Sequence, residues 1–172
     1  MSDLGRQLVR GVGDVVFPPT CVHCQNVVEG GPLRYVCEPC SRKITMVNAP
    51  HCSTCGYPFW GEVEGERMCP HCADLTPVFS EGRTTVLSKG PARSLVLALK
   101  YHHGLHVLKD METIFRQSEE LMDWVRGATL IPVPLHPRKE RERGFNQSQL
   151  IAESLARAAG GATCVETILK RV

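Results

Sequence analysis

The chain has 172 residues, enough for one domain or two small ones. Eight of its nine cysteines lie between Cys21 and Cys72. The formal charge of +2 is also uneven: Lys and Arg number six against eight Asp and Glu up to Leu75 (−2), and fourteen against ten from Thr76 onward (+4). No apolar run approaches the roughly 20 residues that cross a membrane, so we expect a soluble, cytoplasmic protein without a membrane span.

The first segment, residues 1–20, predicts a short amphipathic helix followed by a turn. Leu4, Leu8 and Val12 recur at helical spacing, and glycines 11 and 13 limit the length of the helix. The run Phe17-Pro18-Pro19 then ends it and leads the chain into the first cysteines. The stretch Met1–Arg10 is polar and has no apolar core, so it does not predict a signal peptide.

Residues 21–75 carry four Cys-x-x-Cys pairs at regular intervals. Twelve residues separate the first two pairs and thirteen separate the last two. Zinc binds four thiolates in a tetrahedron, and two such pairs joined by a short hairpin form a zinc ribbon. The sequence therefore predicts a double zinc ribbon with two zinc ions. The first ion is held by Cys21, Cys24, Cys37 and Cys40, and the second by Cys52, Cys55, Cys69 and Cys72.

Two alternatives to this arrangement remain open at this point. In a cross-braced site the first and third pairs share one ion. A disulfide framework would suit a small secreted domain, but the absence of a predicted signal peptide favours metal. With two tetrathiolate zinc sites contributing about −4, the ribbon half has a charge near −6, which disfavours nucleic-acid binding. Gly56 follows Cys55 directly, where we expect a positive φ.

Residues 76–172 have the pattern of an α/β domain with an incomplete parallel sheet. The strand after residue 128 is expected to be buried on both faces, and its two prolines suggest that the strand ends there or lies at an edge. Gln149 is expected to complete a capping box with Asn146. Cys164 is expected to be a small buried residue. We expect chelation to unfold the ribbons and leave this half intact. The predicted elements are a strand over Arg83–Leu87, helices over Gly90–Tyr101 and Leu105–Arg126, a strand over Thr129–Leu135, a loop over His136–Phe145, a helix over Asn146–Ala159 and a strand over Cys164–Leu169.

The loop before the last predicted helix is rich in charge. It lies after a strand and before a helix N-terminus, where α/β sheets bind ligands and where anions are attracted. Gly144 permits close backbone approach, and the two amide side chains that follow offer hydrogen bonds to a ribose or a base. A solvated loop with balanced charge is the alternative. The candidate ligand-binding residues are Arg138, Lys139, Arg141, Arg143, Gly144, Asn146 and Gln147.

Several blocks together resemble the ComF competence family, a double zinc ribbon fused to a type I phosphoribosyltransferase-like domain. They are FPPTCVHC, CEPC, CSTCG, CPHC, LALKYHHG and LIPVPLHPRKERERGFNQSQLIAESLA. The resemblance places Arg143–Gln147 in the family's signature loop and Lys100-Tyr101 in a lysine–tyrosine step. It implies a role in DNA uptake, with a phosphorylated small molecule, a competence-machinery protein or single-stranded DNA as partner.

This sequence also differs from the family pattern that it resembles. Complete family members continue past LKRV into an acidic loop of the form VDDVxTTG, which would hold phosphoribosyl pyrophosphate (PRPP) with Mg²⁺. The Asp residues after Asp74 are Asp110 and Asp123, both in predicted helices. We therefore expect a fragment or a chain without the donor site, and no catalysis by these residues alone. A zinc-dependent protein-interaction or anion-binding module without catalysis is the alternative function, and a nucleic-acid-binding ribbon is disfavoured by charge.

Overall fold

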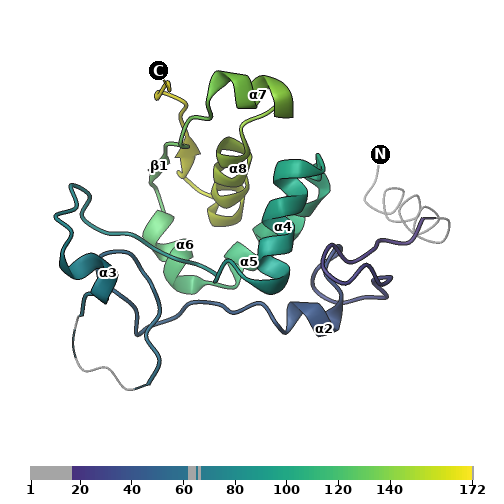
Figure 1. Ribbon diagram of the computed structural model, residues 1–172, viewed down its shortest axis with the longest axis horizontal. Coiled ribbons are helices and arrows are strands. Elements are labelled where there is room, and N and C mark those ends of the chain that lie inside the picture. The colour runs from purple at the N-terminus through teal and green to yellow at the C-terminus, as the bar shows by residue number, and fades with distance from the viewer. Residues whose placement is uncertain (1–16, 62–64, 66, 172) are drawn as a thin grey trace.

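The computed structural model describes residues 17–61, 65 and 67–171, and Figure 1 shows the arrangement. The apolar positions of the predicted N-terminal helix lie outside these residues. The fold mixes helices with a small parallel sheet. No helix in the described residues is long and apolar enough to cross a bilayer. The elements are α2 (Glu38–Ser41), α3 (Pro70–Ala73), α4 (Gly90–Tyr101), the 3₁₀ helix η1 (Leu105–Val107), α5 (Leu108–Arg116), α6 (Glu119–Val125), β1 (Thr129–Leu130), α7 (Pro137–Arg143), α8 (Gln147–Ala159) and β2 (Cys164–Val165).

Helix α4 has the predicted bounds. Pro91 lies in its first turn, where a missing N–H costs no intrahelical hydrogen bond. Leu95 and Leu99 are fully buried on one face, one turn apart. The apolar spacing and the proline therefore were sufficient to define this helix.

The predicted helix over Leu105–Arg126 is divided into η1, α5 and α6. The break is at Ser118, whose Oγ accepts a hydrogen bond from the backbone N–H of Leu121 (3.3 Å) and caps α6. Gly127, with φ 71°, follows α6 as predicted. Apolar periodicity continued across the break, which is why the prediction of one helix was wrong.

The sheet has two short strands, with Thr129 opposite Cys164 and Leu130 opposite Val165 in parallel register. The prediction of a strand buried on both faces was wrong, because Ile131 and Val133 are 43% and 69% exposed. The prolines at 132 and 134 have no N–H to continue the ladder beyond Leu130. Cys164 is exposed rather than buried, since only β1 lies beside it in the described sheet.

The segment Arg83–Leu87 does not join this sheet, so the strand predicted there was wrong. Val86 instead forms an isolated antiparallel bridge with Met46, between the two cysteine tetrads in sequence. The N–H of Val47 donates to the carbonyl of Thr85 (2.9 Å), and the N–H of Leu87 donates to that of Thr45 (3.0 Å). The chain after the second cysteine tetrad therefore pairs with the segment that connects the first tetrad to the second.

The predicted loop His136–Phe145 contains helix α7 instead. Pro137 suits its first turn, and His136 Nδ1 accepts from the N–H of Arg138 (3.2 Å). Gly144, with φ 81°, ends it. Helix α8 follows with Asn146 as N-cap, whose Oδ1 accepts from the N–H of Ser148 (3.0 Å). Gln149 bonds Glu153 rather than returning to Asn146, so the predicted capping box was wrong in its second half.

The main hydrophobic core joins the first ribbon (residues 21–47) to the helices. Buried ribbon residues Leu33 and Val36 belong to the same cluster as Leu95 and Leu99 of α4 and Ile114 of α5. The second ribbon (residues 48–80) has a separate small cluster built around its own cysteines. Helix α8 packs on α5 and α6. That the helical half folds independently of metal stays a prediction. Because the first ribbon shares this core, we expect the independence to hold for loss of the second zinc ion only.

Candidate metal centres and the basic segment

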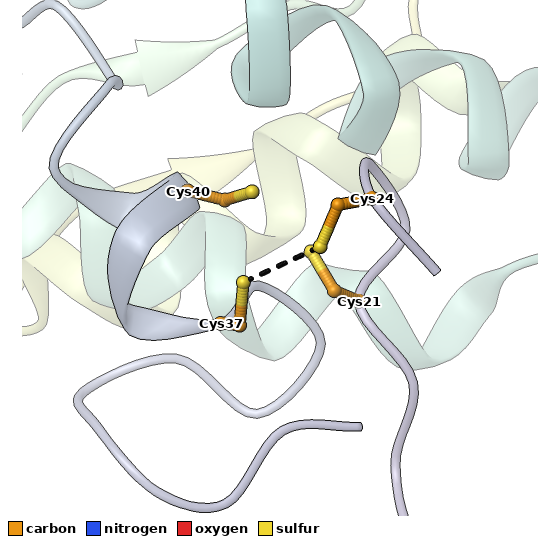
Figure 2. A group of neighbouring side chains, drawn as sticks. All are labelled: Cys21, Cys24, Cys37 and Cys40. Atoms are coloured by element: carbon orange, nitrogen blue, oxygen red, sulfur yellow. Dashed lines mark hydrogen bonds between the residues drawn. The ribbon is translucent and has the colours of Figure 1, made fainter. Parts of the chain in front are cut away.

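The first cysteine tetrad is assembled from two local turns (Figure 2). Cys21 and Cys24 come from a turn near the start of the described chain, and Cys37 and Cys40 from α2 and its N-cap. All four sulfurs lie within 4.8 Å of one another, and the Sγ atoms of Cys24 and Cys37 are 3.5 Å apart. A tetrahedral site with Zn–S bonds of about 2.3 Å has sulfurs about 3.8 Å apart, so these sulfurs fit one zinc ion.

The second tetrad repeats this construction with Cys52 and Cys55 from a turn and Cys69 and Cys72 from α3 and its N-cap. Its sulfurs also lie within 4.8 Å of one another, with 3.8 Å between those of Cys55 and Cys69. The predicted pairing is confirmed, and the cross-braced alternative does not occur. All nine cysteines are free thiols, so there is no disulfide framework.

The turns that present the first pair of each tetrad share one backbone pattern. The N–H of Gln25 donates to the carbonyl of Cys21 (2.9 Å), and the N–H of Gly56 donates to that of Cys52 (2.9 Å). Both donors have positive φ, 64° at Gln25 and 70° at Gly56, as predicted for Gly56. A Cβ at Gly56 would lie 2.6 Å from the backbone nitrogen of Thr84, so that position requires glycine.

The ionisation of the thiols favours a cation at each centre. Burial disfavours the thiolate of Cys21, but N–H groups of Cys24, Cys37 and His23 outweigh it and lower its pKa to about 6. Burial and the neighbouring sulfurs raise the pKa of Cys40 to about 12. The metal-free tetrad therefore holds one favoured thiolate beside thiols that resist ionisation, a conflict that a divalent ion removes.

The second tetrad shows the same division. Burial opposes ionisation of Cys52, yet N–H groups of Cys69, Cys55 and Thr54 lower its pKa to about 6. Burial and the adjacent sulfurs raise the pKa of Cys72 to about 12. The N–H of Cys69 lies 3.2 Å from the sulfur of Cys52, the kind of amide–thiolate contact that zinc ribbons use. The two tetrads therefore fit two zinc ions, one in each ribbon.

The basic segment follows β1 and comprises α7 and the start of α8. The Arg138 and Lys139 side chains both pair with Glu142, at 3.1 and 2.9 Å. These two contacts lower the pKa of Glu142. Arg141 is exposed, and none of the ion pairs recorded in the described part of the chain involves it. The alternating charges in the sequence therefore form ion pairs along α7, as expected for the alternative of a solvated segment with balanced charge.

The end of the segment makes contacts with α4 and the strand. The Arg143 guanidinium lies 5.7 Å from the centre of the Tyr101 ring and donates to Gln147 Oε1. Asn146 donates from Nδ2 to the carbonyl of Val133 (3.1 Å) while its Oδ1 caps α8. Sequence reasoning missed the pairing of Arg143 with Tyr101. The available signal was the exposed aromatic at the last residue of α4.

Asp110 is a second residue that sequence reasoning missed. Its carboxylate is buried in α5 and accepts from the backbone N–H groups of Arg34 (2.9 Å) and Tyr35 (2.7 Å) in the first ribbon. Burial raises the pKa of Asp110, against the two amide bonds. The signal in the sequence was an acidic residue three positions after Val107 and four before Ile114, on the apolar face of a helix.

Comparison with known proteins agrees with this geometry. Residues 12–73 match the family described as "Double zinc ribbon domain". Competence protein ComFC of Bacillus subtilis (strain 168) is 23% identical over 132 residues, which cover 73% of this chain and 53% of ComFC. The chain thus spans about half the length of that relative. No solved structure matches significantly. The double ribbon, its two cysteine tetrads and the similarity to ComFC together support the resemblance of this chain to the ComF family.

Proposed function

We propose that this chain is the ribbon-bearing part of a phosphoribosyltransferase-like protein that acts in DNA uptake during competence. The main support is the extent of the similarity to ComFC. The match covers 132 residues, whereas the double zinc ribbon accounts for 62 (73 − 12 + 1). More than half of the aligned residues therefore lie outside the ribbon match. In this proposal residues 21–75 form the ribbons and residues 76–172 form the first part of the transferase-like domain.

The geometry after β1 supports a phosphate-bearing ligand. Strand β1 leads into α7 and then into the N-terminus of α8, a helix of thirteen residues whose first N–H groups carry partial positive charge. Arg141 and Arg143 lie close to this helix start in the sequence, and nothing lies within 4 Å of a Cβ built at Gly144. In the proposed site the arginines neutralise the phosphate, and the open backbone at Gly144 lets it approach.

Catalysis is proposed only for a protein that also carries the acidic loop implied by the family resemblance. That loop would supply the ribose contacts of PRPP and the carboxylates around Mg²⁺. Among the candidate residues Asn146 and Gln147 are engaged in the contacts described above. Arg141 and Gly144 remain for ligand contact, and Arg143 keeps further N–H donors besides the one it gives to Gln147. This chain's own contribution is therefore to bind and orient a phosphate.

The first test is the reading frame after the codon for Val172. If it continues into an acidic loop, the protein from the complete frame should bind PRPP with Mg²⁺ in isothermal titration calorimetry. Arg143→Ala should weaken that binding about tenfold, as expected for one charged hydrogen bond. Arg126→Ala, an exposed arginine paired with Asp123 on α6, is the matched control. Equal affinities for the two variants would contradict the proposal.

A zinc-dependent interaction module without catalysis is the second candidate. The observation that favours it is the internal pairing of Arg138 and Lys139 with Glu142, which reduces the charge available to a ligand. A reading frame that ends at Val172 would select this function over the first. A continuing frame together with PRPP binding would select the first.

A further inference from the structure

The second ribbon presents two aromatic rings that its own core does not use. The rings of Tyr57 and Trp60 are 5.9 Å apart at their centroids and tilted by 59°. Their residues are 47% and 66% exposed. Phe59, between them in the sequence, packs instead against the cluster formed by the cysteines. The turn after Cys55 therefore places one ring inward and leaves a neighbouring pair outward.

The second ribbon also stands apart from the main core. In Figure 1 the chain around α3 extends away from α4 and α8. Its cluster of buried residues is made of Cys52, Cys69 and Cys72, with partly buried Cys55 and Phe59 packed against it. Exposed tryptophan and tyrosine side chains are enriched at interfaces, because each buries a large apolar area while keeping a polar atom. The position of the ring pair is suited to a docking partner.

The charge of this ribbon indicates what kind of partner fits. Residues 48–80 contain four acidic residues and one basic residue, a net of −3, to which a tetrathiolate zinc site adds −2. Three of the acidic residues, at positions 62, 64 and 66, follow Trp60 within six positions. A segment of this net charge repels the phosphates of a nucleic acid and attracts cations. Tryptophan is also the aromatic residue whose ring face binds arginine and lysine best.

We propose that the Tyr57–Trp60 surface of the second ribbon binds a basic segment of a partner protein. Arginine or lysine side chains of that segment stack on the two rings, and the negative charge of the ribbon orients them. The zinc ion fixes the turn that carries the rings. This role goes beyond the proposed phosphate binding and uses none of the residues of the basic segment, so the two can fail separately.

Fluorescence anisotropy with defined probes tests this inference on the zinc-loaded chain. The probes are a 12-residue Gly/Ser peptide with four arginines, the same peptide with glutamines in their place, and a 12-nucleotide single strand. We expect the arginine peptide to bind and to be released by added salt, and the other two to bind at least tenfold more weakly. Equal binding of the glutamine peptide, tighter binding of the oligonucleotide, or no binding of the arginine peptide would overturn the inference.

Variants locate the binding surface. Trp60→Ala and Tyr57→Leu should each weaken binding of the arginine peptide at least fivefold, with two zinc ions retained by mass spectrometry. Tyr57→Leu keeps apolar volume and so tests the ring face even if Trp60→Ala disturbs the turn. Trp124→Ala, which removes the 46% exposed tryptophan of α6, should leave binding unchanged. Equal effects of Trp60→Ala and Trp124→Ala on peptide binding would refute the assignment. So would a wild-type dimer in analytical sedimentation that Trp60→Ala converts to a monomer.

Discussion

Asp110 joins the first ribbon to the helices, and Asp110→Ala tests how strongly. The carboxylate accepts from the N–H groups of Arg34 at 2.9 Å and Tyr35 at 2.7 Å. Alanine removes both acceptors and leaves two partly buried donors without their partner. Because the peptide that carries these donors lies next to α2, the loss should affect the first zinc site as well as α5.

The structure allows the size of this effect to be worked out. A fully buried donor without a partner costs about 1–3 kcal/mol, so two partly buried donors cost at most about 2–6 kcal/mol. Burial raises the pKa of Asp110, which means that the carboxylate itself is desolvated and that its removal relieves part of this cost. We therefore expect the lower part of the range, about 2–3 kcal/mol. For a chain of this length that corresponds to a melting temperature lower by roughly 4–12 °C.

Urea unfolding followed by circular dichroism, with zinc in excess, measures the change. Lys109→Ala is the matched control, because Lys109 is the exposed neighbour on the same helix and should alter stability by less than about 0.5 kcal/mol. Asp110→Asn keeps one acceptor and should fall between the two. If Asp110→Ala is no less stable than Lys109→Ala, the carboxylate does not hold the ribbon to α5 and the reasoning is refuted.

Three further predictions follow from the two centres. Cys40→Ser should lose one zinc ion and reduce hydrogen-exchange protection of α4 and α5. Cys72→Ser should lose the other zinc ion and leave that protection intact. Equal effects of the two variants on α4 would contradict the shared core. Zinc binding at pH 7 should release at least two protons per site, because the pKa values of Cys37 and Cys40, and of Cys55 and Cys72, are raised. Calorimetry in buffers of different ionisation enthalpy measures the number of protons released. The affinity for zinc should fall as the pH falls. Gly56→Ala should weaken zinc retention at the second site more than Gly61→Ala, since both residues have positive φ but only Gly56 has backbone atoms within 3 Å of the added Cβ; similar zinc loss from both would rule out the clash.

The features that the sequence predicted correctly depend on short-range chemistry. A Cys-x-x-Cys turn brings two sulfurs together within four residues, so spacing identified the ligands and favoured the pairing of neighbouring turns, and the structure then excluded the cross-braced alternative. Helix α4 and most of α8 were predicted for a similar reason, since their apolar faces and their caps are local. The positive φ at Gly56 also follows from its place directly after a cysteine pair.

The features that were missed depend on contacts between distant residues or on local caps that compete with periodicity. The carboxyl group of Asp110 meets amides more than seventy positions earlier in the chain, and no spacing rule reports such a contact. Ser118 divides a continuous apolar pattern, and His136 and Pro137 start a helix where the charges suggested a loop. The strand after residue 128 was expected from its apolar content to be buried on both faces, but only Thr129–Leu130 pair, and the prolines that suggested an end or an edge follow directly.

The central claim is that neighbouring cysteine pairs hold one zinc ion each, in two ribbons. Native mass spectrometry of the wild-type chain and of Cys21→Ser, Cys40→Ser and Cys52→Ser measures it most directly. We predict two zinc ions in the wild type and one in each single variant. The Cys21→Ser/Cys52→Ser double variant should bind no zinc, whereas the Cys21→Ser/Cys40→Ser double variant should still bind one ion. One zinc ion or none in the wild type, or retention of one ion by the Cys21→Ser/Cys52→Ser double variant, would contradict the claim.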